Sequence, residues 1–333
     1  MIRSIVAALA AIAAVAACGA EPEPTGAAGM AAGVAVAATV EAAETVRAPW
    51  RCALGPAPGA PPVQATLTIG PRTWRREGER LVVARGRPRV TIAAVADARG
   101  AAPAVADVLR AAHVDVVVAV GGMGAGADAL HASLAALTDP AWLTVAVPGG
   151  SEDWPALART VGDLAAAGAP VVDGGGVRVV DAGAAVIAVI PGERHPERLA
   201  AGAEGCVHDD ADRARILRLL ADAAGERPRV LVGIAAPQGE ASDLAPGGIH
   251  AGEPGLAEAV ADAEVDVVVH APLDAEPPAP GRARTGDRVV LAAGSLDPVP
   301  RLGPGGGRRP TGVTLVTVDG RTVTWRFVPV AVE

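Results

Sequence analysis

Lysine and tyrosine are absent from this sequence, and phenylalanine occurs once among its 333 residues. All 29 basic residues are therefore arginines, and the formal net charge is −8 at pH 7. That charge leaves no basic footprint for nucleic acid, so nucleic-acid binding is disfavoured. Hydrophobic residues make up 50% of the chain and aromatic residues 2%. The composition predicts a sizeable core of Ala, Val, Leu and Ile, in one large domain or two small ones.

The chain opens without an apolar run long enough to cross a bilayer as a mature helix. Its first apolar run covers residues 5–17 and follows Arg3, which is the arrangement of an export signal. The run ends in "VAAC", residues 15–18, which resembles the lipobox of bacterial lipoproteins. The resemblance implies a signal peptide over residues 1–17, cleavage before Cys18, and acylation of the thiol and new amino group of Cys18. The alternative is an ordinary signal peptide cut at an A-x-A site.

A lipid anchor would export the protein and hold its domain on a membrane of the cell envelope. Gly19 directly after the cysteine fits sorting to the outer membrane of a Gram-negative cell, on the periplasmic or surface side. Residues 18–48 are rich in Ala, Gly, Glu and Pro without a steady period, which predicts a flexible tether.

Cysteine is also rare, and only Cys52 and Cys206 remain once Cys18 is assigned to the anchor. In an exported protein, two cysteines form a disulfide more often than a metal site, because two thiols alone rarely fill a coordination shell. The sequence does not show whether the two are close, so their pairing stays open at this point.

The remainder, residues 49–333, reads as one α/β domain with a β-hairpin extension at residues 49–88. In the extension, "ATLTIG" and "RLVVARG" flank the polar turn "PRTWRREGE". From residue 89, near-continuous apolar strands alternate with helices, which is typical of a sheet buried on both faces. The tail after residue 287 reads as strands alone. The pattern predicts a layered fold of two packed mixed β-sheets flanked by helices.

Ligands in open α/β sheets bind beyond the carboxyl ends of the strands. Asp97 and Arg99 follow the first strand of this region, and glycines follow the next two. Later strands end in an Ala-Ala-Pro turn, in His270 and in a Gly-Ser pair. The strand ends in chain order are Asp97–Gly100, Gly121–Gly124, Gly149–Asp153, Ala235–Pro237, His270–Pro272 and Gly294–Ser295.

This order and spacing resemble the calcineurin-like metallophosphoesterases over residues 89–330. Members of that family carry D-x-H, G-D, G-N-H-[DE], H and G-H-x-H at successive strand ends, often followed by a Gly-Ser pair. The resemblance implies a layered α/β fold, phosphoester hydrolysis and two divalent metal ions, Mn, Fe or Zn, that activate water and clamp the phosphate.

Few of the family's metal ligands are present at the matching positions. Asp97 matches the aspartate of D-x-H, but Arg99 stands in place of the histidine. Gly122 replaces the aspartate of G-D that would bridge the two metals. Gly150 and Ser151 replace the asparagine and histidine of G-N-H.

The second half of the motif set is similarly incomplete. Ala235 stands where a ligand histidine is expected, although Pro237 is kept. His270 matches the first histidine of G-H-x-H, and Pro272 falls where the second would be. The Gly294–Ser295 pair is kept. His250 lies in "GIHAGEPGLAEAV", which resembles the loop and helix before the G-H-x-H strand.

Two remnants, Asp97 and His270, cannot supply the three or more ligands that each ion needs. Arg99 would also place a positive charge where a cation should bind. We therefore expect a pseudoenzyme without metal cofactors that binds an anionic small ligand or an envelope protein. The alternative is an active metal-dependent phosphoesterase whose ligands are rearranged, with Asp128, Glu152, Asp153 or Asp274 as substitutes. A purely structural envelope protein is the third reading, favoured if side chains fill the old cleft.

Structural roles compete for several of these residues. Asp97 could cap the following helix, and His270 could be a hydrogen-bonded histidine at the rim of the site. Glu152 and Asp153 open a helix, where carboxylates favour capping. Arg99, His270 and the amides of the glycine-rich turns could instead hold an anion. The serines form no G-x-S-x-G elbow, so a serine hydrolase is unsupported.

Overall fold

The structure, a computed structural model, describes residues 48–57, 65–99, 103–239, 241–245, 249–272, 283–285, 288–297 and 310–331. The chain divides after Ala48, and the second unit, Pro49–Glu333, carries the fold described below. The signal peptide, Cys18, the tether up to residue 47 and Asp274 lie outside the described residues. No helix in the described part is both long enough and apolar enough to span a bilayer.

One sheet of the second unit has seven strands in the order β18-β17-β4-β5-β6-β7 with β16 beside β4. Strands β4 to β7 are parallel, and β17 runs antiparallel to β4. Every residue of β4 after Arg89 is buried, as expected for an interior strand. The strands are β4 (Arg89–Ala96), β5 (Val116–Val120), β6 (Leu143–Val147), β7 (Val171–Asp173), β16 (Gly294–Ser295), β17 (Gly312–Asp319) and β18 (Thr322–Pro329).

The second sheet has nine strands in the order β1-β2-β3-β8-β9-β10-β13-β15-β14. Its central strands β9, β10, β13 and β15 are parallel. A separate pair joins β11 (Leu244–Ala245) and β12 (Ile249–His250). The nine strands are β1 (Thr66–Ile69), β2 (Arg72–Glu77), β3 (Arg80–Val83), β8 (Val179–Asp181), β9 (Val186–Ile190), β10 (Arg229–Gly233), β13 (Val267–His270), β14 (Ala283–Thr285) and β15 (Arg288–Ala292).

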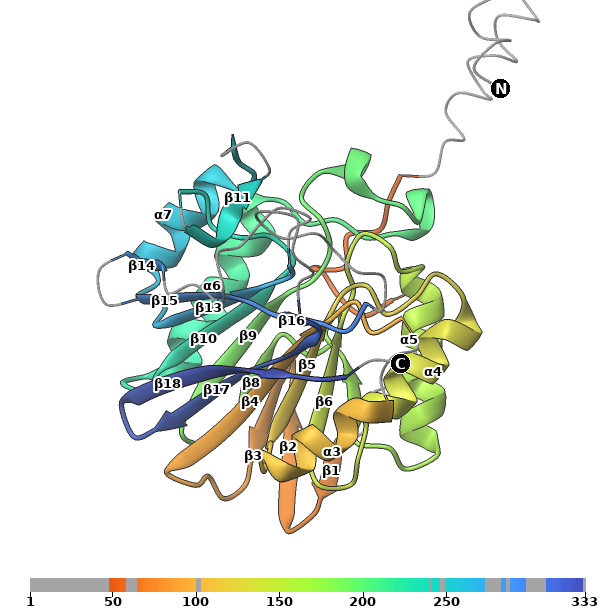
Figure 1. Cartoon of the computed structure of the whole chain (residues 1–333), viewed down its shortest axis with the longest axis vertical. Helices are drawn as coiled ribbons and strands as arrows, with labels where there is room; N and C mark the ends of the chain where they lie inside the picture. The colour runs from red at the N-terminus through yellow and green to blue at the C-terminus, as the bar shows by residue number, and fades with distance from the viewer. Residues whose placement is uncertain are drawn as a thin grey trace, which may run out of the picture. The chain divides into compact units, whose positions relative to one another are not determined.

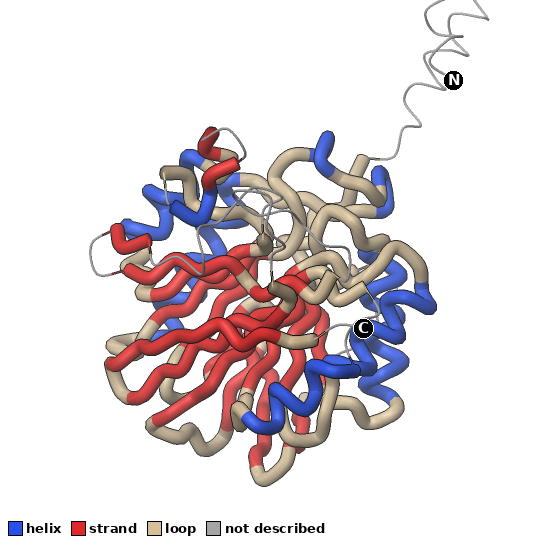
Figure 2. The backbone as a smooth tube through the Cα atoms, in the orientation of Figure 1, coloured by secondary structure: helices blue, strands red, loops and turns tan. Residues whose placement is uncertain are grey.

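The two sheets pack face to face between two groups of helices (Figures 1 and 2). Aliphatic residues of both sheets form one buried cluster between them, while two further clusters join each sheet to its helices. The predicted layered α/β fold with two packed mixed sheets is therefore confirmed. The helices are α3 (Pro103–Ala111), α4 (Ala127–Leu137) and α5 (Trp154–Ala166) on the seven-stranded sheet, with α6 (Asp210–Ala224) and α7 (Pro254–Asp262) on the nine-stranded sheet.

The N-terminal extension differs from the predicted hairpin, because the supposed polar turn is itself a strand. β2 pairs with β1 on one side and with β3 on the other. Trp74 faces the core and is 1% exposed, whereas its neighbours in β2 point outward. Thr73, Arg75 and Glu77 form the solvent face of β2, while Arg72 and Arg76 lie on the same face as Trp74 and are half-buried.

Residues 48–57, here called the N-terminal strap, are fastened to the loop before α6. Cys52 and Cys206 form a disulfide. On either side of it, the Trp50 amide donates to the Gly205 carbonyl at 3.0 Å and the Val207 amide donates to the Trp50 carbonyl at 2.7 Å. The buried guanidinium of Arg178 also donates to the Cys52 carbonyl. The strap is thus held to the rest of the domain by a disulfide and by hydrogen bonds.

Candidate functional site

The carboxyl ends of β4, β5 and β6 meet at one edge of the seven-stranded sheet, here called the seven-stranded side. It comprises Asp97, Gly122, Gly150 and Glu152 with their neighbours. The Asp97 amide donates to the Gly121 carbonyl at 3.1 Å, and the Gly121 amide donates to the Val147 carbonyl at 3.0 Å. The three turns that carry the motif remnants are therefore adjacent, as the sequence predicts.

Asp97 is mostly buried and takes the left-handed conformation with φ of 51°. Parallel pairing of β16 with β4 sets Ser295 beside Ala96, and the Ser295 hydroxyl donates to Asp97 Oδ2 at 3.0 Å. Helix α3 begins only at Pro103, so Asp97 is not at the N-cap position of that helix. The Asp97 carboxylate instead bonds within the strand-end turns, where it faces Gly294 and Ser295.

Gly122, at the bridging position, leaves no room for a side chain. A Cβ atom there would overlap Asp97 Oδ1 and would lie 2.7 Å from Asp97 Cα. The residue also has φ of 67°, which disfavours any L-residue with a side chain. The turn of β5 therefore packs directly on the turn of β4, and an aspartate at position 122 requires one of them to move.

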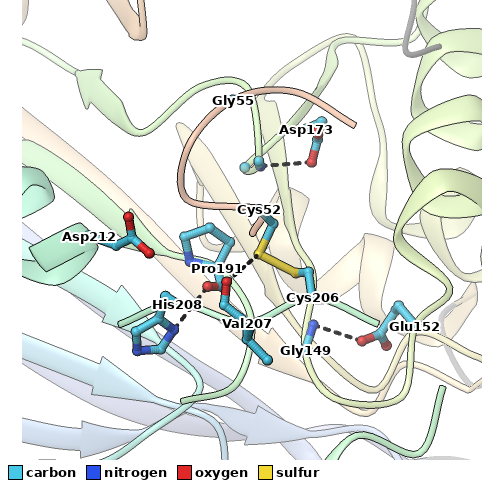
Figure 3. The surroundings of a disulfide bond; sticks show 12 residues. Cys52, Gly55, Gly149, Glu152, Asp173, Pro191, Cys206, Val207, His208 and Asp212 are labelled. Atoms are coloured by element: carbon cyan, nitrogen blue, oxygen red, sulfur yellow. Dashed lines mark hydrogen bonds between the residues drawn. A yellow bond between two sulfur atoms is a disulfide. The ribbon is translucent and has the colours of Figure 1, made fainter. Parts of the chain in front are cut away.

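Glu152 links the turns of β5 and β6, and Figure 3 shows its carboxylate bonded to Gly149. Its carboxylate accepts hydrogen bonds from the Met123 amide at 2.7 Å and the Gly149 amide at 2.8 Å. The Ser151 hydroxyl donates to the same carboxylate at 3.0 Å. Glu152 is fully buried, and this desolvation raises its pKa, against the lowering effect of the hydrogen bonds. The residue thus ties two strand ends together rather than capping α5.

Helix α5 is capped instead by Asp153, whose carboxylate accepts from the Ala156 amide at 2.7 Å. Asp128, another suggested substitute ligand, is exposed in the first turn of α4. Arg99 is about half exposed, and its guanidinium lies 3.8 Å from the carboxylate of Asp297. Asp153 and Asp128 therefore add no metal ligand at the strand ends, and Arg99 is paired with an acid there.

The loop after β9 covers the turn of β6. The amides of Ala200 and Ala201 donate to the Gly150 carbonyl at 2.8 and 3.2 Å. A Cβ on Gly150 would lie 3.0 Å from Cγ of Glu193. Burial raises the pKa of Glu193 from its ordinary 4.5 to about 7, and the charges of Glu253 and Glu152 act in the same direction. The disulfide at Cys206 holds this covering loop in place, because the Glu193 amide donates to the Cys206 carbonyl at 3.0 Å.

A second group of polar residues lies at the carboxyl end of β13, here called the nine-stranded side: Asp243, His250 and His270. His270 is fully buried, and its Nδ1 lies 2.7 Å from the Ala271 carbonyl. Its Nε2 has no hydrogen-bond partner in the described part of the chain. Burial lowers the pKa of His270 from 6.5 to about 4, so the ring is neutral at pH 7.

His250 points its Nδ1 at Asp243 Oδ1, 2.5 Å away. Asp243 is fully buried, while the side chain of His250 is 43% exposed. The other oxygen of Asp243 accepts from the Gly239 and Gly252 amides at 3.0 and 3.3 Å. The sequence motifs single out His250 but not Asp243, because no strand-end motif covers the short turn at residue 243. The pair orients an exposed imidazole and stabilises the loop around it.

A small cavity lies on this side among the residues that the structure describes. This cavity of about 10 Å³ lies between the ends of β9 and β10 and helix α7, which is room for about one water molecule. His208 and Glu253 are the ionisable residues that line it, with aliphatic residues around them. Glu253 is held by Arg213, whose guanidinium donates to its carboxylate at 2.8 Å.

The residues of the described part do not fit the two-metal site that the family resemblance implies. No group of three or more His, Cys, Asp or Glu side chains in those residues is placed to hold an ion. Asp97 faces Ser295, Glu152 is bound to backbone amides, and His250 is bound to Asp243. Apart from Nε2 of His270, these donors are thus committed to other protein groups.

No protein-family model and no curated protein sequence matches the chain. Among solved structures, one matches at a TM-score of 0.54 with 13% identity, covering 73% of this chain and 100% of that chain. A dimetal phosphatase from Danio rerio matches at 0.43 with 11% identity, covering 73% and 99%. Purple acid phosphatase PPD1 from yellow lupin seeds matches at 0.45 with 8% identity, covering 78% and 56%.

These neighbours share the layered α/β fold and nothing finer. At 13% identity or less, a likeness speaks for fold alone, and the two phosphatase matches fall below a TM-score of 0.5. The fold assignment itself rests on the strand order and the layers described above.

Proposed function

We propose that this chain is a membrane-anchored lipoprotein whose phosphoesterase-like domain is non-catalytic and serves binding or scaffolding in the cell envelope. The observation that carries the proposal is Glu152, whose carboxylate lies between the turns of β5 and β6 and accepts from both. In a two-metal enzyme that region must stay open to ions, water and a phosphate. Here a protein carboxylate and close backbone contacts occupy it.

The same arrangement favours a macromolecular partner over a small anion. Glycine-rich turns attract anions through their free amides, but the amides of Met123 and Gly149 already donate to Glu152. The carbonyl of Gly150 is covered by the loop that follows β9. A partner protein of the envelope therefore fits better than a small ligand at this edge.

The disulfide supports export. Disulfides persist in oxidising compartments and are rare where thiols are kept reduced, and Cys52 and Cys206 are paired and fully buried. The bond also fastens the strap that follows the tether predicted at residues 18–48. Export and anchoring are tested by expressing the full chain with labelled palmitate. Label and membrane fractionation should both be lost in Cys18→Ser, whereas retained label in that variant would contradict the anchor.

The absence of catalysis is tested with the full chain and a panel of phosphomonoesters and phosphodiesters, with Mn²⁺, Fe²⁺ or Zn²⁺ supplied in turn. The proposal expects no turnover above that of an Asp97→Ala variant. Turnover that Asp97→Ala abolishes would overturn it. Circular dichroism of both proteins checks that the variant is folded.

A second candidate, an active metal-dependent phosphoesterase with rearranged ligands, is favoured by one feature. Nε2 of His270 is buried and has no hydrogen-bond partner in the described residues, as a vacant ligand atom would be. In that case His270→Gln should abolish metal-dependent turnover while His250→Gln reduces it less, since His250 is bound to Asp243.

A further inference from the structure

The loop between β3 and β4 concentrates unpaired positive charge on an acidic protein. It presents Arg85, Arg87 and Arg89, all exposed. None of these three guanidinium groups has a hydrogen bond or ion pair within the described part of the chain, whereas most of the other arginines there are bound to carboxylates or carbonyls. Three free guanidinium groups in five residues form a local cationic patch, here called the arginine loop.

The backbone of the arginine loop is fixed against the domain. Gly86 packs so closely on Gly183 that a Cβ at position 86 would lie 2.6 Å from Cα of Gly183. The carbonyl of Pro88 accepts from the amide of Gly320, in the turn between β17 and β18, at 2.9 Å. The arginines are therefore presented from an ordered surface, and little backbone entropy is lost when they bind.

Neighbouring acids do little to neutralise the patch. Asp181, near Gly183, is already bound by Arg227. Asp319, exposed and opposite Arg89 in the β17–β4 pairing, is the acid that faces the loop directly. Next to it, Arg321 is itself paired with the highly exposed Glu226 at 3.0 Å. The balance of charge around the loop stays positive.

The arginine loop and the N-terminal strap lie at opposite ends of the sheets. The loop ends at Arg89, the first residue of β4, while Asp97 and the strand-end turns follow the last residue of β4. The strap contacts the loop before α6 and the start of α5, on the carboxyl side of the parallel strands. An eight-residue strand separates the two ends by roughly 26 Å. A chain held through the strap thus leaves the arginine loop free to reach a second surface.

The three guanidinium groups of the arginine loop favour one class of binding partner over the others. Single-stranded nucleic acid needs aromatic stacking platforms, and all five tryptophans and the one phenylalanine of this chain are buried or half-buried. A folded protein partner needs buried apolar anchors, and the large apolar side chain exposed in the described part, Leu54, belongs to the strap at the other end. A flat array of phosphates needs only guanidinium groups, which bind it with two parallel hydrogen bonds each.

We propose that the arginine loop docks on the phosphate headgroups of an anionic lipid surface. Each basic residue near such a surface strengthens binding by roughly fivefold at low salt. The net charge of −8 does not prevent this, because acids more than about 10 Å away are largely screened at 0.1 M salt. The inference is independent of whether the strand-end site is catalytic.

The test compares three versions of the full chain that differ only in exposed, unpaired arginines. The loop variant carries Arg85→Gln, Arg87→Gln and Arg89→Gln. The matched variant carries the same change at Arg159, Arg218 and Arg326, which are exposed and scattered over α5, α6 and β18. Each protein is sedimented with phosphatidylcholine vesicles and with vesicles in which about a third of the lipid is phosphatidylglycerol.

Wild type and the matched variant should bind the anionic vesicles at least about tenfold more than the neutral ones, and the excess should vanish at high salt. The loop variant should lose that excess. The apolar N-terminal residues contribute equally to all three proteins and to both vesicles. Equal loss in both variants would assign the effect to net charge, and an unchanged loop variant or no anionic preference would likewise overturn the proposal. If the triple loop variant fails to fold, the single change Arg87→Gln replaces it in the test. This change is expected to lower binding to the anionic vesicles about fivefold.

Discussion

The turns at the carboxyl ends of the two sheets satisfy their polar groups in different ways. On the seven-stranded side, glycines bring the turns into direct contact, and the carboxylate of Glu152 is satisfied by backbone amides. On the nine-stranded side, ionisable groups persist: Asp243 and His250 form a pair, and His270 keeps an unpartnered Nε2 among the described residues. On the seven-stranded side, the turns pack together and their polar groups are bonded to one another. The nine-stranded side keeps side chains that could still take part in chemistry.

Under the proposed function, the difference indicates where a two-metal site is lost first. A bridging aspartate would serve both ions, so glycine at position 122 leaves each ion without that ligand. With this glycine, the turn of β5 packs directly on Asp97. His270 would serve one ion at most, and it is buried as a neutral imidazole at pH 7. If the domain is non-catalytic as proposed, the missing bridging ligand on the seven-stranded side is enough to prevent two-metal binding, whatever the other side retains.

The largest effect is expected from restoring the acid with Gly122→Asp. The new Cβ overlaps Asp97, and φ of 67° disfavours a side chain, so the free energy of unfolding should fall by about 2–5 kcal/mol. Urea denaturation measures it. In the matched change Gly126→Asp, φ is −128° and no atom lies within 4 Å, so stability should rise by a few tenths. Equal stability of the Gly122→Asp variant and wild type would mean that the turns are not packed as described.

Next in size is Glu152→Ala, which leaves the buried amides of Met123 and Gly149 without an acceptor. We expect a loss of about 2–4 kcal/mol, because each unsatisfied amide costs about 1–3 kcal/mol. Glu152→Gln keeps one acceptor oxygen and should lose about half as much. Thermal and urea denaturation measure both losses. If both variants were as stable as wild type, Glu152 would not hold the two turns together.

The third expectation concerns the pH dependence of the seven-stranded side. Glu193 has a pKa of about 7 in the fold against an ordinary 4.5, so its protonated form is favoured by folding. That stability is fully present below pH 4.5 and is lost as the pH rises through 7. Relative to wild type, Glu193→Gln should remove a fall of about 2–3 kcal/mol over this range. Parallel stability curves of the two proteins would contradict a buried Glu193.

The nine-stranded side should respond to pH in the opposite direction and somewhat less. The pKa of His270 is lowered from 6.5 to about 4, so its stability contribution is present above pH 6.5 and is lost as the pH falls through 4. His270→Gln should reduce the acid loss by about 2 kcal/mol at pH 5. An acid limb that is unchanged in this variant would show that the ring is not buried in neutral form.

Much of this contrast was visible in the sequence. The spacing of apolar strands and glycine-rich turns predicts the layers and brings Asp97, Gly122 and Gly150 to one edge, because parallel strands end on the same side of a sheet. These features depend on local pattern, which is why one sequence carries them.

The role of Glu152 could not be predicted in this way. Its position before α5 indicates capping, yet its carboxylate reaches the Met123 amide 29 residues earlier. The same limit applies to Asp243, whose partner lies across a short turn without any motif, and to β2, where one buried tryptophan lies among arginines. Contacts between distant segments decide these cases, and local periodicity does not record them.

The most direct test of the account is the metal content of the purified full chain. After dialysis against Mn²⁺ or Zn²⁺ and removal of free ion, elemental analysis should find far less than one ion per chain, with no difference between wild type and Asp97→Ala. One or two ions per wild-type chain, lost in Asp97→Ala, would show that the strand ends still hold a metal site and would contradict the central claim.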